Sequence, residues 1–282
     1  MTFGVIGGDR RQAELASLLA AEGERVMTYG LGRWRPQSEV LLEKAAGADV
    51  VILPLPLCRG EGILNCEGED LRVRDLFGCM RPEQLVLAGQ VKSDQWQEAA
   101  ERGVFLRDYF RREELTVANA VATAEAALQI AMERLDCTLL GMPCLVLGFG
   151  RIGKLLSHRL RGMGAEVTAT ARCPGDLAWI RAYGFRDLET DRLEGKLGRF
   201  GLVFNTVPAL VLTGVLLAEL PEGCLCIDLA SAPGVDSMAA AEHGVSLVWA
   251  RALPGRYVPV TAARAIFDAV RYMILEERGD PT

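Results

Sequence analysis

The stretch Cys144-Leu-Val-Leu-Gly-Phe-Gly-Arg-Ile-Gly153 decides the fold of this chain. An apolar run typical of a β-strand leads directly into three glycines with the spacing G-x-G-x-x-G, and a helix with an apolar stripe follows. In this context the glycines form a dinucleotide-binding turn. Gly148 permits the tight turn, Gly150 lets the backbone approach a diphosphate, and Gly153 allows the helix to pack closely on the strand. The sequence therefore predicts a nucleotide site, with a glycine-rich turn that binds no ligand as the alternative.

The strand predicted after this helix, at 166–170, bears on the choice of nucleotide. An NAD site places an Asp or Glu near the end of that strand, about 20 residues beyond the glycines, where it binds the ribose 2′-hydroxyl. The segment Thr168-Ala-Thr-Ala-Arg172 holds no acid, and its arginine is a cation that can bind a 2′-phosphate. We therefore expect NADP rather than NAD as the cofactor.

Short β-rich runs alternate with segments of helical periodicity along almost the whole chain, which is typical of βαβ units and parallel sheets. The predicted strands are 3–6, 25–29, 49–53, 85–88 and 104–106 in a first series, and 144–147, 166–170, 202–205, 225–228 and 246–249 in a second. The Ala-rich segment 119–135 predicts a long helix that bridges the two series. A helix at about 260–276 is expected to pack back on the first series.

These patterns predict an α/β protein with two doubly wound, Rossmann-like parallel-sheet domains, separated by a cleft and joined by long helices. Residues 1–118 together with 259–282 are predicted to form an N-terminal substrate domain. Residues 119–258 are predicted to form an NADP-binding domain.

The chain of 282 residues carries 31 Lys and Arg against 37 Asp and Glu, a net charge of -6. This balance gives no positive surface for a phosphate polymer, so nucleic acid is not expected as a partner. The apolar stretches 139–150 and 207–220 are interrupted before the roughly 20 residues that a bilayer span needs, so no membrane segment is expected. Eight cysteines without a C-x-x-C pair, and only two histidines, predict reduced core thiols in a cytoplasmic protein and no metal site.

In an open α/β sheet, ligands bind beyond the carboxyl ends of the strands. The segments 205–209, 228–234 and 253–255 follow predicted strands of the second domain, and each combines small residues with a proline that fixes the backbone. Rigid backbone of this kind can approach a nicotinamide ring, although ordinary strand-to-helix turns have the same composition. The predicted cofactor-binding residues are Gly148, Phe149, Gly150, Arg151, Ile152, Gly153, Thr170, Arg172, Asn205, Thr206, Val207, Pro208, Leu229, Ala230 and Ser231.

The chain resembles the A subunit of bacterial dipicolinate synthase in a series of motifs that extends over nearly its whole length. The motifs are Ile6-Gly-Gly-Asp-Arg-Arg, Leu53-Pro-Leu-Pro-Leu, Asn119 with Thr123-Ala-Glu, Gly148-Phe-Gly-Arg-Ile-Gly, Asn205-Thr-Val-Pro-Ala, Asp228-Leu-Ala-Ser-Ala-Pro-Gly, and Ala252-Leu-Pro-Gly with Pro259-Val-Thr-Ala. The resemblance implies two α/β domains around a cleft, similar to those of alanine and 2-hydroxyacid dehydrogenases.

The resemblance also implies a reaction, the NADP-dependent oxidation of dihydrodipicolinate to dipicolinate, the chelator of the spore core. It implies a cytoplasmic hetero-oligomer in which a flavoprotein-like B subunit takes part. Ala122, the segment 233–236 and Ala263 depart from the family's usual pattern. These departures leave open a divergent relative that acts outside sporulation.

A cyclic substrate with two carboxylates requires cations beside it. The candidates at predicted loop ends are Arg10, Arg11 and Arg256, for which surface charge is the alternative. Oxidation to an aromatic ring also releases a proton, and Glu125, Asp228 or solvent is the candidate acceptor, while Asn119 can orient the ring. A capping or solvated role is the alternative for each of these three side chains.

Two other functions stay open at this point. A 2-hydroxy or 2-amino acid dehydrogenase has the same architecture, but such enzymes usually pair a histidine acid/base with a carboxylate. The two histidines here, His158 and His243, lie within or at the end of predicted helices and read as structural. The third possibility is a non-catalytic nucleotide-binding protein that only stabilises or regulates a partner.

Overall fold

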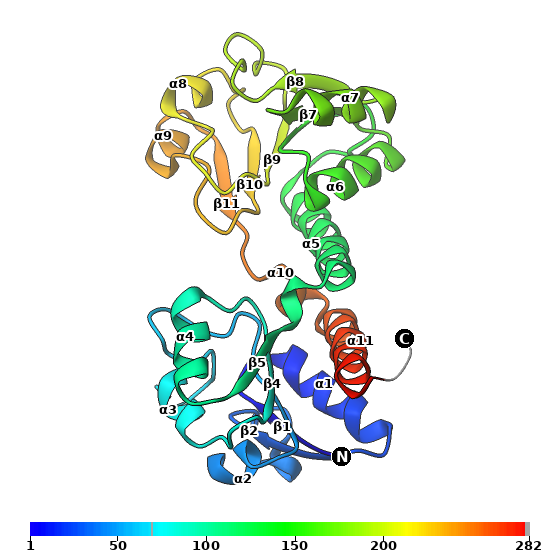
Figure 1. Cartoon of the computed structure of the whole chain (residues 1–282). Coiled ribbons are helices and arrows are strands. Elements are labelled where there is room, and N and C mark those ends of the chain that lie inside the picture. The colour runs from blue at the N-terminus through cyan, green and yellow to red at the C-terminus, as the bar shows by residue number, and fades with distance from the viewer. Residues whose placement is uncertain (69, 280–282) are drawn as a thin grey trace. The chain divides into compact units, whose positions relative to one another are not determined.

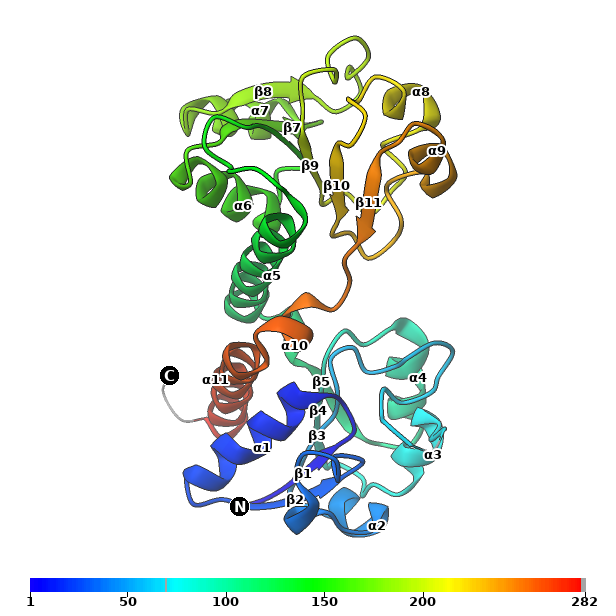
Figure 2. The same ribbon diagram turned by 180° about the vertical axis from the view of Figure 1, so that it is seen from behind.

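A computed structural model describes residues 1–68 and 70–279 of the chain. The chain divides into two compact units (Figures 1 and 2). Unit 1 comprises Met1–Asn119 and Val258–Thr282, and unit 2 comprises Ala120–Tyr257. Each unit is built on one parallel sheet with helices on both faces, so the predicted α/β class with two parallel-sheet domains is confirmed.

The sheet of unit 1 has the order β2-β1-β3-β4-β5, and all its strands run parallel. The strands are β1 (Thr2–Ile6), β2 (Arg25–Tyr29), β3 (Val50–Ile52), β4 (Leu85–Ala88) and β5 (Phe105–Asp108). The helices are α1 (Arg10–Ala21), α2 (Leu42–Ala46), α3 (Val73–Gly78), α4 (Ser93–Glu101) and α11 (Pro259–Arg278), with short 3-10 turns at Pro36–Ser38 and Tyr109–Arg111. This order places the topological switch point, where ligands of such sheets bind, between β1 and β3.

Side chains of alternate strand residues point to opposite faces of a sheet, and the core of unit 1 follows this rule. Val5 and Ile52 pack with the apolar faces of α1 and α11. Ile6 and Val51, their neighbours in sequence, pack on the other face with α2, α3 and α4. Because both faces are covered, the central strands β1, β3 and β4 are apolar at almost every position, as buried parallel strands usually are.

The sheet of unit 2 has the order β11-β10-β9-β6-β7-β8, again with all strands parallel. The strands are β6 (Pro143–Leu147), β7 (Glu166–Ala171), β8 (Arg186–Glu189), β9 (Leu202–Asn205), β10 (Leu225–Asp228) and β11 (Ser246–Trp249). The helices are α5 (Glu113–Arg134, which begins in unit 1), α6 (Arg151–Gly162), α7 (Pro174–Ala182), α8 (Gly214–Leu217), α9 (Ser237–Glu242) and α10 (Leu253–Tyr257). Counted from β6, this is the strand order of a dinucleotide-binding sheet, with its switch point between β6 and β9.

The core of unit 2 also has two layers. Val146 and Phe204 pack on one face with α5, α6 and α7, and Leu145 and Val203 pack on the other face with α8, α9 and the segment 193–200. The helices α6 and α7 cover the β7–β8 side, as Figure 1 shows. Both layers therefore hold β6 at the centre of the sheet, which fixes the turn that follows this strand.

Several predicted elements differ from the structure. The strand β8 was not predicted, because three of its four residues are charged and give little apolar signal; none of its residues is fully buried. The segment 253–255, predicted as a loop, begins the short helix α10. The long helix starts at Glu113 rather than at 119, since the polar residues before 119 are exposed on a helix that the Ala-rich part stabilises.

The structure bears on two expectations from composition, and it corrects the one about the thiols. Among the described residues, α5 alone is long and apolar enough to cross a membrane, and 56% of its apolar window is buried inside the structure, as in a core helix. Cys79, Cys137 and Cys173 are exposed, so they are not core thiols. Burial raises the pKa of the Cys144 and Cys224 thiols to about 12, so these two remain neutral.

Candidate functional site

The turn after β6 lies at the switch point of unit 2, beside the end of β9. The amide of Thr206, just past β9, donates to the Leu147 carbonyl at 2.9 Å, and its hydroxyl donates to the same oxygen at 2.8 Å. Gly148 has φ +91°, a conformation that side chains rarely adopt, and a Cβ there would lie 2.5 Å from the Thr206 hydroxyl oxygen. The tight contact between the two loops therefore requires glycine at this position.

The other two glycines of the turn have different surroundings. A Cβ on Gly153 would collide with the carbonyl oxygen of Gly148, so this position needs glycine for packing. A Cβ on Gly150 would meet no atom within 4 Å. The backbone at Gly150 thus faces open space, which is where a ligand can approach it closely.

The helix α6 begins at this open position. Gly150 is its N-cap residue, and no side chain among the described residues caps the helix. The first N–H groups of a helix have no intrahelical partner, and together with the helix dipole they attract phosphate. The glycine turn and the uncapped end of α6 therefore fit the diphosphate of a dinucleotide. Phe149 is buried beneath the turn, while Arg151 is exposed at the start of the helix.

Thr170 and Arg172 lie at and just beyond the end of β7. The fully buried Thr170 hydroxyl accepts a hydrogen bond from the Gly148 amide at 3.2 Å and is 3.0 Å from the hydroxyl of Thr190. Arg172 is exposed in the turn that leads into α7. The β8 residue in register with Ala171, Glu189, is an acid that pairs with Arg192 at 3.1 Å. The end of β7 therefore offers a cation without a carboxylate of its own.

Thr190 was missed by the sequence analysis. It follows β8, the mostly charged segment that was not recognised as a strand. The apolar residues of Phe185-Arg-Asp-Leu-Glu are three positions apart, so the segment lacks the alternation that would have identified the strand.

Asn205 and Asp228 form a buried network at the ends of β9 and β10. The Asn205 Nδ2 group donates to Asp228 Oδ1 at 2.8 Å and to the Val207 carbonyl at 3.0 Å. The Asp228 carboxylate also accepts from the amides of Ala230 at 3.1 Å and Gly234 at 2.8 Å. Asp228 is only 2% exposed. Its charge is therefore used to hold two loops in place, and its oxygens are already occupied by donors.

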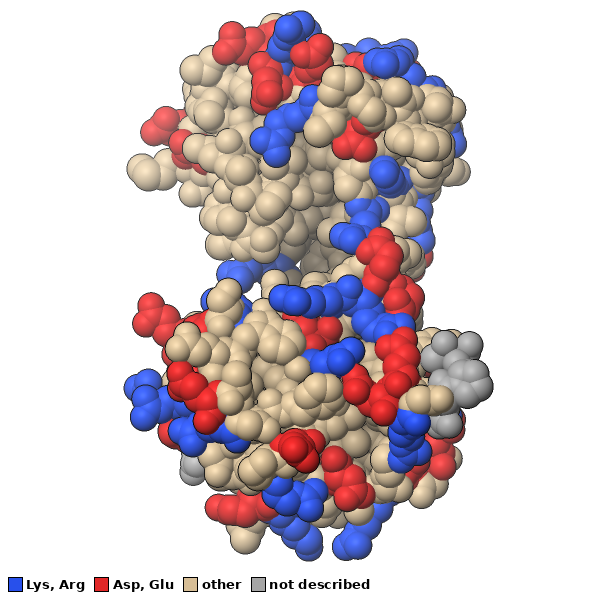
Figure 3. Space-filling model, in the orientation of Figure 1, with Lys and Arg blue, Asp and Glu red and all other residues tan. Residues whose placement is uncertain are grey.

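The two loops that this network holds are the ones predicted to face the cofactor. Leu229 and Ala230 are buried, and Pro208 and Ser231 are exposed. The Trp249 indole donates to the Ala230 carbonyl at 3.1 Å, a contact that the sequence did not indicate. The segments 201–218 and 229–235 contain no charged residue, and Figure 3 shows a broad uncharged area over this part of unit 2. Such a surface suits a planar ring better than an ionic ligand.

The other two predicted catalytic residues lie on α5. Glu125 is paired with Arg159 of α6 at 2.9 Å, and its side chain is 55% exposed. This pair joins two helices on one face of the sheet. Asn119 is half-buried and is the last residue of unit 1 before the boundary within α5. Glu125 and Asp228 thus come from different parts of unit 2, and the roles of all three residues stay predictions.

The three predicted substrate arginines have different surroundings. Arg10 is exposed and pairs with Glu14 at 3.2 Å, and Arg256 lies over the ring of Tyr257 in α10. Arg11 is 5% exposed, and its guanidinium donates to Asp9 at 2.8 Å and to the carbonyl of Leu55. Arg11 therefore links the ends of β1 and β3 at the switch point of unit 1.

The glycines that precede these arginines use their amides internally. The Gly7 amide donates to the Tyr29 carbonyl at 2.8 Å, and the Gly8 amide donates to the Asn65 carbonyl at 2.6 Å. The Asp9 side chain caps α1 by accepting from the Arg11 amide. The turn after β1 is therefore a rigid structural element, in which Arg11 supplies the buried charge.

Neither histidine lies at the carboxyl edge of a sheet. His158 of α6 packs edge-on against Tyr183 and Phe185, with ring centroids 4.9 and 5.0 Å away. Burial, and then the charge of Arg161, lower the pKa of His158. His243 is the C-cap residue of α9. These places support the structural reading of both residues.

Comparisons with known proteins agree with this architecture. Residues 2–110 match the family model of the N-terminal domain of the dipicolinate synthase A subunit. The dipicolinate synthase A subunit of Bacillus subtilis (strain 168) is 26% identical over 293 residues, which cover 99% of this chain and 98% of the relative. The crystal structure of the corresponding protein from Bacillus halodurans superposes with a TM-score of 0.86 at 26% identity, and covers 97% of each chain.

More distant structures share the fold. An L-alanine dehydrogenase superposes with a TM-score of 0.64 at 15% identity, over 98% of this chain and 90% of that chain. The two-unit architecture is thus the dehydrogenase-like one that the sequence predicted.

Proposed function

Because this chain resembles the A subunit of dipicolinate synthase over nearly its whole length, we propose that it is an NADP-dependent oxidoreductase that converts dihydrodipicolinate to dipicolinate together with a B subunit. The observation that carries the proposal is the turn after β6. Its open Gly150 and the uncapped N-terminus of α6 suit a diphosphate, and Arg172 stands beyond the neighbouring strand without an acid beside it on β7.

The chain's own residues would contribute binding and orientation. The reaction removes a hydride and a proton from a dihydropyridine ring, and NADP, when bound, supplies the hydride acceptor. The turn at 148–153 would hold the diphosphate, and Arg172 the 2′-phosphate. The network of Asn205 and Asp228 would keep the uncharged loops 206–209 and 229–234 rigid around the nicotinamide.

Nucleotide titration calorimetry tests the cofactor choice. Wild-type protein should bind NADP more tightly than NAD. Arg172→Ala should weaken NADP binding by about 1.5 to 3 kcal/mol, the cost of losing a charged hydrogen bond, and leave NAD binding unchanged. Arg181→Ala is the matched control, because Arg181 is an exposed arginine of the same unit that pairs with Asp187. Equal wild-type affinities for the two nucleotides would refute the preference.

Turnover is tested with dihydrodipicolinate generated in situ, with and without the B subunit. Appearance of NADPH together with pyridine absorbance is the expected result. Nucleotide binding without turnover, even with the partner added, would instead support a non-catalytic role.

A further inference from the structure

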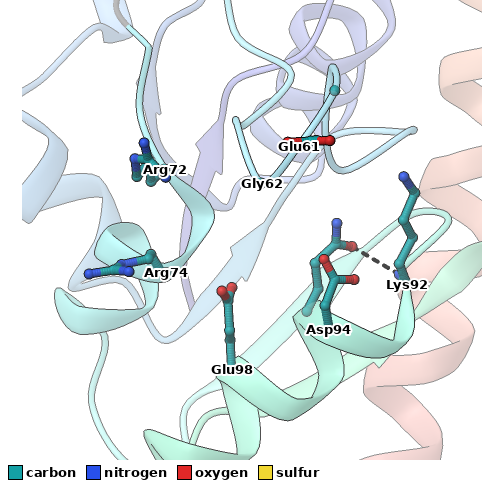
Figure 4. Close-up of a pocket in the computed structure, with 9 residues that line it drawn as sticks. Glu61, Gly62, Arg72, Arg74, Lys92, Asp94 and Glu98 are labelled. Carbon is teal, nitrogen blue, oxygen red and sulfur yellow. Dashed lines mark hydrogen bonds between the residues drawn. The ribbon is translucent and has the colours of Figure 1, made fainter.

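Unit 1 contains a hollow of about 470 Å³ that the proposed cofactor site does not use. It lies between the loop after β3, the start of α3 and the first turns of α4 (Figure 4). All three segments follow the carboxyl ends of β3 or β4, the edge at which parallel sheets bind ligands. Its volume falls in the range of roughly 300 to 1,000 Å³ of small-molecule sites.

The charged side chains around the hollow alternate in sign. Arg72 and Arg74 stand on the α3 side, Glu98 and Asp94 project from α4, and Lys92 stands at the far side, as Figure 4 shows. Glu61 lines the opposite loop. Across the hollow the order is therefore cation, acid, cation.

These charges do not neutralise one another. Among the residues that the structure describes, the lining side chains make a single ion pair, Arg74 with Asp75 at 3.5 Å, and Asp75 does not line the hollow. In the same loop region Arg59 pairs with Asp70 at 2.7 Å. Opposite charges too far apart to pair directly are left for a molecule that can contact both.

The floor of the hollow is rigid. Gln95 is 1% exposed; its Oε1 accepts from the Lys92 amide at 2.9 Å, and its Nε2 donates to the Cys58 sulfur at 3.1 Å. These two contacts fix the start of α4 to the loop after β3. Lys92, Asp94 and Glu98 are therefore carried on a backbone that is already in place before a ligand binds.

We propose that this hollow binds a small dicarboxylate that carries a proton-bearing nitrogen between its two carboxylates. One carboxylate contacts Arg72 and Arg74, the nitrogen donates toward Glu98 and Asp94, and the second carboxylate contacts Lys92. This inference concerns unit 1 and does not depend on the proposed function. All the residues proposed to bind the ligand belong to unit 1.

Calorimetry on the full chain in metal-free buffer tests this with two stable probes. Iminodiacetate has a protonated nitrogen between its carboxylates, whereas benzene-1,3-dicarboxylate has two carboxylates and no nitrogen. Iminodiacetate should bind saturably and about tenfold more tightly, since only it gains from the acids of α4. Absence of saturation by about 10 mM, or equal affinity for both probes, would overturn the proposal.

Two variants assign the contacts. Glu98→Gln should weaken the binding of iminodiacetate about tenfold. The affinity for benzene-1,3-dicarboxylate should stay equal or increase, because the repulsion between its carboxylates and Glu98 is removed. Arg72→Gln should weaken both probes about tenfold. The matched controls are Glu101→Gln, one turn further along α4, and Arg25→Gln on β2, and both should bind as wild type does. If Glu98→Gln lost affinity for both probes equally, the assigned order of charges would be wrong.

An NADP titration on the same samples separates this inference from the proposed function. Failure of NADP binding with retained iminodiacetate binding would count against the proposed function only. The reverse result would count against the hollow only.

Discussion

Asp228 is the residue with the clearest structural consequence. Its buried carboxylate accepts hydrogen bonds from Asn205, Ala230 and Gly234. In Asp228→Asn an NH2 group replaces one acceptor and faces a donor, so we expect the free energy of unfolding to fall by about 1 to 3 kcal/mol. Denaturant unfolding measures this. Asp191→Asn, at an exposed turn, is the control and should change stability by less than about 0.5 kcal/mol. If the free energy of unfolding of Asp228→Asn equalled that of wild type, the network would not contribute to stability as expected.

His158 provides a pH-dependent prediction. Burial, and then Arg161, lower its pKa below the ordinary value of 6.5, so the unfolded chain binds this proton more readily than the folded one. The contribution to stability is therefore present above pH 6.5 and decreases as the pH falls through the folded pKa. An NMR titration should give a midpoint below 6.5, and Arg161→Gln should raise it. Arg199→Gln should leave it unchanged, and a midpoint above 6.5 would show the prediction to be wrong.

At the scale of elements, two glycines of the turn between β6 and α6 have different roles: Gly153 is needed for packing, and Gly150 is open to a ligand. Gly153→Ala places a Cβ against the Gly148 carbonyl, so it should destabilise the protein by about 1 to 3 kcal/mol. Gly150→Ala meets no atom and has φ -74°, so stability should stay within about 1 kcal/mol of wild type. The same methyl group stands where a diphosphate would approach, and NADP affinity should fall at least about tenfold. Thermal unfolding measures the stability of both variants, and calorimetry measures their NADP affinity. Equal losses of stability in the two variants would contradict the prediction.

At the scale of the whole molecule, the proposed nucleotide contacts all fall within unit 2. We expect NADP to slow hydrogen exchange most at 148–153, 170–173 and 205–208, because binding stabilises the segments that it contacts. At 100 times its dissociation constant, NADP should stabilise the protein by about 2.7 kcal/mol. Hydrogen exchange with mass spectrometry measures the pattern, and Gly150→Ala should need a higher NADP concentration for the same protection because its affinity is lower. Protection confined to residues 1–119 would contradict the prediction.

Much of the fold was readable because its signals are local. The apolar runs of β6, β9 and β10 predicted these strands within a residue or two, and the glycine spacing after β6 predicted the turn. The strand β8 was missed because it is only partly buried and its apolar pattern is weak. Asp228 was one of the candidate proton acceptors, with a capping role as the alternative, because its place in the sequence cannot distinguish a free carboxylate from one that already accepts hydrogen bonds.

The sequence by itself determined the two parallel-sheet units and the glycine turn, because periodicity and conformational preference act over a few neighbouring residues. The tertiary structure alone decided which side chains meet. Asp228 contacts Asn205 across two strands, Arg11 reaches the Leu55 carbonyl, and the charges around the hollow come from three separate segments. Such contacts depend on strand order and on the packing of both faces, and residues far apart in the chain carry no local record of them.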